Sequence, residues 1–217
     1  MKKLNFIIFI FVILGFLHLG CAHRLNINVD EIGHYSKPLI EPLPIKVGVY
    51  YGNDFRTYKT IQENDYTQGV TRISKIQLGK ANIALFDYIS SHLFENVISI
   101  QHFPNELENL KNIDLILEPK ISNYDYSERT VFYEPAAQVN IEYRINFYSP
   151  DGKQIGTWTI SGESSRYITW HGIEVMRRHT SVKKLTHLSM REVAAQFFAD
   201  FCNQSDIKKH FDKKCKQ

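Results

Sequence analysis

The sequence lacks the residue patterns on which most metal and hydrolytic chemistry depends. It has only three cysteines in 217 residues, with no Cys-x-x-Cys pair and no His-x-x-x-His pair, so the common zinc-binding spacings are absent. The Gly-x-Ser-x-Gly motif of serine hydrolases is also missing. No internal repeat and no low-complexity segment is evident. We therefore expect no metal, no other cofactor and no catalytic residues, and we expect that the protein is not an enzyme.

Long hydrophobic runs are absent except for one at the N-terminus. Lys2 and Lys3 precede an unbroken apolar stretch over residues 6–17. This stretch has about a dozen residues, whereas a helix that crosses a bilayer needs roughly 20. The order of charged, apolar and small residues is typical of an export signal, so we expect a signal peptide over residues 1–20. Three kinds of signal fit this order: a lipoprotein signal, after which the chain is attached to lipid, an ordinary cleaved signal, and an uncleaved anchor.

The signal ends in Gly20 and Cys21, which resemble the lipobox of bacterial lipoproteins, with His18 where an aliphatic residue is usual. In that family the cysteine sulfur receives a diacylglyceryl group and the chain is cut just before it. The resemblance therefore implies lipidation of Cys21, with acyl chains such as palmitate holding the protein in a membrane. Ala22 lacks the aspartate that favours retention in the inner membrane, so the resemblance implies the periplasmic face of the outer membrane.

Strong charge of either sign is absent from the expected mature chain. Removing residues 1–20 takes away Lys2 and Lys3 and no acid, so the formal net charge falls from +3 to +1. Whole-molecule electrostatics therefore does not indicate a nucleic-acid partner. Because an exported protein also has little access to nucleic acid, we expect none.

Two cysteines remain once Cys21 is assigned to lipid. Cys202 and Cys215 are an even pair in an oxidising compartment, which favours a disulfide. Closing a loop of about 14 residues is worth roughly 3 kcal/mol in the chain-entropy model. The alternative is two unpaired thiols.

The rest of the chain divides into a tether and one domain. Residues 21–44 hold three prolines among polar residues without a sustained period, which is typical of a semi-rigid tether. Residues 45–217 are expected to form a single globular domain with a basic C-terminal tail. Its predicted first half comprises a strand over 45–52, a loop or hairpin over 55–76, a helix over 78–94, and strands over 96–103 and 113–121, the last stopping near Pro119.

The second half of the domain shows the clearest alternation in the chain. Apolar residues recur at every second position from Val139 to Phe147, and the turn over 149–152 returns the chain as a hairpin. Ser189 and Glu192 have the spacing of a capping box, which predicts a helix start. We expect an α+β fold in which two main helices cover one side of a mixed or mostly antiparallel sheet.

This layout over residues 45–200 resembles small envelope lipoproteins. It is similar to the lipopolysaccharide-assembly lipoprotein, to auxiliary lipoproteins of envelope transporters and to lipoprotein activators of peptidoglycan synthases. The resemblance implies a non-enzymatic role, in which a lipid-anchored protein binds or scaffolds a larger envelope assembly concerned with transport, lipopolysaccharide handling or the cell wall. The expected partners are the membrane, through the acyl chains, and an envelope protein.

Two groups of residues are candidates for the working surface. Aromatic side chains beside charges suit a protein interface, although tyrosines in strands also serve as core residues. The candidate partner-binding residues are Tyr124, Tyr126, Phe132 and Tyr133. A basic tail could bind phosphates or other anions, although charge runs at chain ends are often only solvated. The candidate anion-binding residues are Lys208, Lys209, Lys213 and Lys214.

An alternative function stays open at this point. Trp170, His171 and Glu174 lie close together in the sequence and could line a pocket of an envelope hydrolase or of a small-ligand-binding protein. A cluster of acid, base and nucleophile in one pocket would favour the enzyme. An uncovered sheet edge or exposed apolar patch without such a cluster would favour the binding protein.

Overall fold

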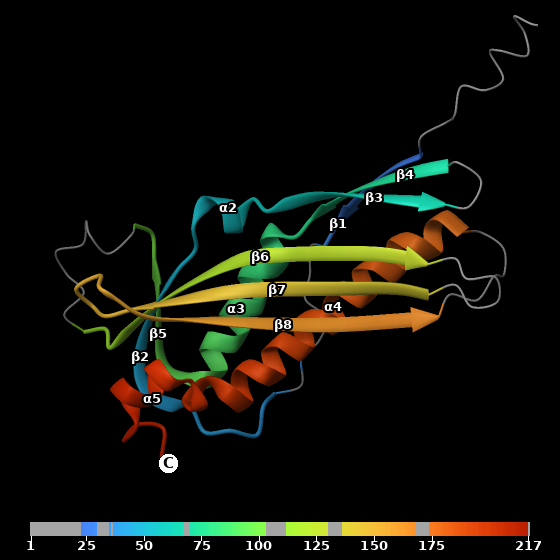
Figure 1. Ribbon diagram of the computed structural model, residues 1–217. Helices are drawn as coiled ribbons and strands as arrows, with labels where there is room; N and C mark the ends of the chain where they lie inside the picture. Colours follow the sequence, from blue (N-terminus) through green and yellow to red (C-terminus); the bar gives the residue numbers. More distant parts are fainter. Residues whose placement is uncertain are drawn as a thin grey trace, which may run out of the picture.

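Figure 1 shows the computed structural model of the chain. The structure describes residues 23–29, 35, 37–66, 70–102, 112–129, 136–167 and 174–216. In chain order the strands are β1 (His23–Asn28), β2 (Leu43–Tyr50), β3 (Lys59–Tyr66), β4 (Val70–Gln77), β5 (Phe94–Ile100), β6 (Leu115–Arg129), β7 (Ala136–Tyr148) and β8 (Gln154–Tyr167). The helices are α2 (Asn53–Arg56), α3 (Gly79–Leu93), α4 (Glu174–Asp200), the 3-10 helix η2 (Phe201–Asn203) and α5 (Ser205–Phe211).

The main sheet has five strands in the order β5-β2-β6-β7-β8. Strand β2 is parallel to both β5 and β6, whereas β6, β7 and β8 form an antiparallel meander. Helices α3 and α4 lie together on one side of this sheet (Figure 1). The predicted α+β class, with a mixed sheet and two main helices, is confirmed.

The hydrophobic core lies between the sheet and these two helices. The alternating residues of β7 from Val139 to Phe147 are at most 1% exposed, as the sequence predicts. The facing residues of α4 include Met190, Val193 and Phe197, all completely buried. Strict alternation places every second side chain of a strand on one face, so this pattern decides which face of β7 is inside. The turn after β7 has Gly152 at φ 81°, a conformation in which glycine is favoured.

The predicted elements of the first half are largely present. Helix α3 matches the helix predicted over 78–94, and β2 and β5 match two of the predicted strands. The segment predicted as a loop or hairpin forms the hairpin β3–β4, with pairing from Lys59 opposite Gln77 to Tyr66 opposite Val70.

A second sheet, which the sequence does not predict, has the order β1-β4-β3. Strand β1 lies inside the segment predicted as a tether, so that prediction is wrong for residues 23–28. It pairs in parallel with β4, and the flanking apolar residues Ile27 and Val29 are 1% exposed. Strand β1 forms because Leu25, Ile27 and Val29 alternate with polar residues. This alternation is too short to predict a strand from the sequence, but it is sufficient when the edge of β4 is available for pairing.

Strand β6 continues past Pro119 to Arg129, so the predicted stop at this proline is wrong. The pairing of β6 with β2 ends at Leu117, whereas the pairing with β7 includes Pro119 opposite Ile145. A proline is tolerated in a strand when its missing N–H points away from the partner strand. One side of β6 is no longer paired with β2 at this point, so a residue without an N–H is tolerated there.

The predicted helix start at Ser189 is also wrong, because α4 runs without interruption from Glu174 to Asp200. The two residues of the supposed capping box instead attach α4 to the sheet. The hydroxyl oxygen of Ser189 lies 2.9 Å from Oγ of Ser164, and Oε2 of Glu192 accepts a hydrogen bond from the backbone N–H of Glu163 at 2.7 Å. Both partners belong to β8.

Candidate binding surface

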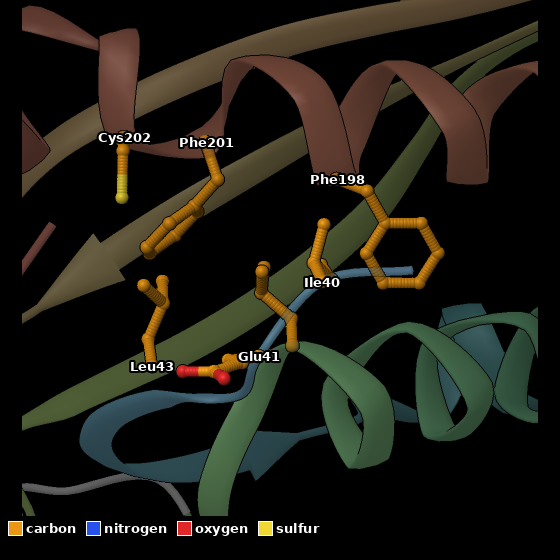
Figure 2. Close-up of a pocket in the computed structure, with 7 residues that line it drawn as sticks. Ile40, Glu41, Leu43, Phe198, Phe201 and Cys202 are labelled. Atoms are coloured by element: carbon orange, nitrogen blue, oxygen red, sulfur yellow. The ribbon is translucent and has the colours of Figure 1, made fainter. Parts of the chain in front are cut away.

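An apolar pocket of about 410 Å³ opens near the end of α4 (Figure 2). It is formed by the segment that leads into β2, the last residue of α3, and the junction of α4 with η2. The lining residues are Ile40, Glu41, Leu43, Leu93, Phe198, Phe201 and Cys202.

Packed aromatic rings fix the inner wall of this pocket. Phe201 is 1% exposed, and its ring centroid lies 5.1 Å from that of Phe94 in an edge-to-face arrangement. Leu43 pairs with Phe94, which brings the entry to β2 beside the end of α3. At the rim, Ile40 is 39% exposed and its neighbour Leu39 is entirely exposed. Because the wall is rigid and apolar, the pocket suits an aliphatic or aromatic side chain.

Strand β5 is an edge of the main sheet that begins beside this pocket, and no other described strand pairs with its outer side. The residues from Glu95 to Ser99 are exposed on both faces of the strand. Val97 is 39% and Ile98 is 48% exposed, and Val97 pairs with the core residue Val47. An exposed edge with apolar side chains is a template for pairing with another strand.

The pocket and the β5 edge lie close together, because the pocket residue Leu43 pairs with Phe94 at the start of β5. Phe94, which packs behind the pocket, precedes Val97 by three residues, a distance of about 10 Å along a strand. We define the candidate binding surface as the pocket together with the β5 edge. Its charged residues are Glu41 and Glu95, both exposed. Within the part of the chain that the structure describes, neither glutamate has an ion-pair partner.

A second pocket, of about 450 Å³, opens where β6 diverges from β2, and it contains the buried carboxylate of Glu118. This carboxylate accepts hydrogen bonds from Nδ2 of Asn146 at 2.9 Å and from the hydroxyl of Tyr148 at 2.8 Å. It also lies 3.1 Å from Nζ of Lys120. Burial and the hydrogen bond to Glu118 raise the pKa of Tyr148 above its ordinary value. With these partners, Glu118 joins β6 to β7.

The aromatic residues predicted to bind a partner are not exposed where the structure describes them. Tyr124 and Tyr126 are each 3% exposed, so as surface anchors they are a wrong prediction. Tyr124 points into the core, where its hydroxyl lies 2.8 Å from Oγ1 of Thr186 on α4. Burial raises the pKa of Tyr124 above its ordinary value. Alternation in β6 puts both rings on the helix-covered face of the sheet.

Several residues singled out in the sequence lie outside the described residues. These are the lipidation candidate Cys21, the partner-binding candidates Phe132 and Tyr133, and the pocket candidates Trp170 and His171. Glu174 is the first residue of α4, and only its backbone is described. Over the described ranges, no group of three His, Cys, Asp or Glu side chains is arranged to hold a metal ion.

The predicted disulfide is present between Cys202 and Cys215, whose Cα atoms are 5.6 Å apart. It ties the chain after α5 to the end of α4, and Cys202 also lines the apolar pocket. Among the predicted anion-binding residues, Lys208, Lys209 and Lys213 are exposed. Lys214 is already paired with Asp114, at 2.8 Å, so it is less available to an anion than the other three.

Within the described residues, no helix combines the length and the apolar character needed to cross a membrane. No protein-family model and no curated protein matches the chain.

Several solved structures are similar to the chain at low scores. A neuraminyllactose-binding hemagglutinin homolog from Helicobacter pylori has a TM-score of 0.49 and 15% identity over 84% of this chain and 97% of that chain. A minor lipoprotein from Acinetobacter baumannii has a TM-score of 0.41 and 8% identity over 73% and 91%. The lipoprotein GNA1162 from Neisseria meningitidis has a TM-score of 0.32 and 9% identity over 66% and 99%.

The candidate binding surface is not among the surfaces that the sequence predicts. The apolar letters of β5 predict a strand, but an edge strand and an interior strand can have the same composition. The pocket joins residues near position 40 to residues near position 200, and no local pattern connects them. One feature of the sequence could have indicated this surface. Leu39 and Ile40 lie between two prolines, and apolar residues in such a proline-rich segment indicate packing against another surface.

Proposed function

We propose that this protein is anchored through lipid on Cys21 to the periplasmic face of the outer membrane and binds a protein partner as a subunit of an envelope assembly. The observation that supports binding is the β5 edge, where Val97 and Ile98 are exposed beside an apolar pocket and no other described strand pairs with the outer side. The signal ending at Gly20–Cys21 supports the anchor, and the disulfide agrees with an oxidising compartment.

The partner that fits this surface presents an extended segment. Such a segment adds a strand to β5 through main-chain hydrogen bonds, and its side chains supply the specificity. One apolar side chain would enter the pocket beside Phe198 and Phe201, because those rings leave space for it. Basic side chains in the same segment would meet Glu41 and Glu95. We therefore propose a partner segment that combines apolar and basic residues.

The test is a crosslinked pull-down of the full-length, membrane-anchored protein from its own cells. Ile98→Lys puts a charge on the β5 edge, where a lysine opposes the addition of a strand. Ile61→Lys is the matched control, because Ile61 is 62% exposed on β3, an edge strand of the other sheet. We expect a defined partner that is captured with the wild type and with Ile61→Lys but is lost with Ile98→Lys.

Two outcomes would contradict the proposal. A partner that binds Ile98→Lys as well as it binds the control would overturn the assignment of the β5 edge. If no protein is captured with either the wild type or the control, the proposed role as a subunit is wrong. Both variants must unfold at the same urea concentration as the wild type, which shows that the lysines act at the surface.

A further inference from the structure

The distance between the proposed lipid and the folded domain is very short. Strand β1 begins at His23, two residues after Cys21. Two residues span at most about 7 Å of extended chain. A tether over residues 21–44 would instead reach about 75 Å when extended, which would let the domain turn freely.

Strand β1 is integrated into the domain and cannot act as part of a tether. All six of its residues pair in register with β4, from His23 opposite Arg72 to Asn28 opposite Gln77. Ile27 and Val29 belong to the main hydrophobic core and are each 1% exposed. Pulling β1 away would expose both apolar side chains to water and would also break the strand pairing.

The start of β1 identifies one end of the molecule. At this end β4 and β7 also begin, and β3, β6 and β8 finish (Figure 1). Helix α5 and the C-terminus lie at the opposite end (Figure 1). The disulfide places Cys202 and the apolar pocket near α5. Along β6, whose 15 residues extend from one end to the other, the separation is about 50 Å.

We propose that the end where β1 begins lies against the membrane surface and that α5, the apolar pocket and the exposed lysines Lys208, Lys209 and Lys213 are directed away from it. This inference rests on the proposed lipidation of Cys21, and it adds a fixed orientation to that proposal. The lipid is too close to β1 for another face of the domain to reach the same leaflet.

Two exposed arginines at the membrane-facing end suit phospholipid head groups. Arg24 is the second residue of β1, and Arg166 is the last but one of β8. Arginine forms paired hydrogen bonds with phosphate, and basic residues are attracted to an anionic membrane surface.

The orientation has a consequence for the proposed binding surface. The pocket adjoins Cys202, whose disulfide partner Cys215 follows α5, so the pocket lies toward the end remote from the lipid. A partner would be bound on the side of the protein that faces the periplasm. An anion bound by Lys208, Lys209 or Lys213 would not be a head group of the anchoring leaflet.

The orientation can be measured on the full-length lipidated protein in vesicles of phosphatidylethanolamine and phosphatidylglycerol. An environment-sensitive fluorophore is attached in turn to Ser165→Cys, two residues before the end of β8, and to Lys209→Cys on α5. Both positions are exposed. Mass spectrometry confirms that the native disulfide is intact. Lipids with a nitroxide on the head group then serve as the quencher. We expect a strong loss of fluorescence at position 165 and none at position 209.

Two further variants separate the orientation from the anchor. Cys21→Ser tests the lipid itself, and a variant that stays with the vesicles would contradict the proposed function. If wild-type protein binds the vesicles but position 209 is quenched as strongly as position 165, only the orientation is wrong. A Gly/Ser spacer of about 20 residues before His23, with an average span of about 25 Å, should remove the difference in quenching between positions 165 and 209. If the difference in quenching persists with this spacer, the short distance between Cys21 and β1 does not determine the orientation.

Discussion

The hydroxyl of Tyr143 on β7 donates a hydrogen bond to Oδ1 of Asn82 on α3 at 2.7 Å, and both side chains are completely buried. This bond joins α3 to strand β7 of the main sheet. Burial raises the pKa of Tyr143 well above its ordinary value, so its hydroxyl stays protonated and remains a donor. Removing the hydroxyl leaves the Asn82 carbonyl oxygen without a partner.

Tyr143→Phe is therefore expected to lower the free energy of unfolding by about 1–3 kcal/mol, the cost of a buried unsatisfied polar group. Urea unfolding followed by circular dichroism measures this change. Tyr35→Phe is the matched control, because the Tyr35 hydroxyl is buried without a hydrogen-bond partner among the described residues. Its removal should leave stability unchanged or raise it. Equal losses in the two variants would show that the bond to Asn82 is not important.

Gly162→Ala is expected to destabilise the contact between β8 and α4. A Cβ atom at Gly162 would lie 2.0 Å from the carbonyl oxygen of Ser189, and backbone atoms cannot rotate aside. Overpacking of this kind typically costs about 1–3 kcal/mol. Gly52→Ala is the control, because no atom lies within 4 Å of the added Cβ there. The two variants are compared by their urea midpoints, and similar midpoints would contradict the tight packing of α4 on β8.

The disulfide is expected to stabilise the folded protein by about 3 kcal/mol, as the chain-entropy model gives for a loop of this length. The double variant Cys202→Ala, Cys215→Ala should therefore unfold at a lower urea concentration than the oxidised wild type. A reducing agent should bring the wild type to the same midpoint and should not change the variant. A wild type that is insensitive to reduction would show that the disulfide adds little.

Asp114 is expected to contribute stability that disappears in acid. Partial burial raises the pKa of Asp114. Two hydrogen bonds, from Nζ of Lys214 and from the backbone N–H of Lys46, each 2.8 Å long, lower the pKa by more than burial raises it. The pKa of Asp114 therefore lies below its ordinary value of 3.8. A carboxyl with a depressed pKa in the folded state stabilises above its unfolded pKa, and this contribution is lost as the pH falls through the folded pKa.

The measurement for Asp114 compares the wild type with Asp114→Asn by urea unfolding at several pH values. The wild type should be more stable at neutral pH, and the difference should shrink as the pH falls below about 4. Because this ion pair is partly exposed, the difference should be small and should decrease with added salt. A difference that does not depend on pH would contradict the role of the charge.

The sequence predicted correctly those elements in which the spacing of apolar residues alone determines the secondary structure. The alternation in β7 and the three- and four-residue spacing in α3 were sufficient, because each places apolar side chains on one face. The helix predicted to follow Ser189 is likewise present, as the second half of α4.

The predictions that were wrong concern residues whose structure depends on contacts with another element, and the local sequence does not reveal these contacts. Ser189 has a capping spacing, but its hydroxyl bonds to Ser164 on β8 in the middle of a helix. Tyr124 has the composition of an interface residue, but α4 covers it and Thr186 satisfies its hydroxyl. The β5 edge was predicted only as a strand, because its position at the edge depends on β2, which comes much earlier in the chain.

The position of β2 in the main sheet also sets an order for folding. Strand β2 lies between β5 and β6, so Val47 has to find Val97 and Leu115, which come much later in the chain. The meander of β6, β7 and β8 closes only short loops, which costs less entropy and is faster. If the chain is exported with its N-terminus first, as the proposed function implies, β2 stays unpaired until β5 and then β6 have followed it. On the proposed export route, the apolar strand β2 therefore needs protection from aggregation until its neighbours arrive.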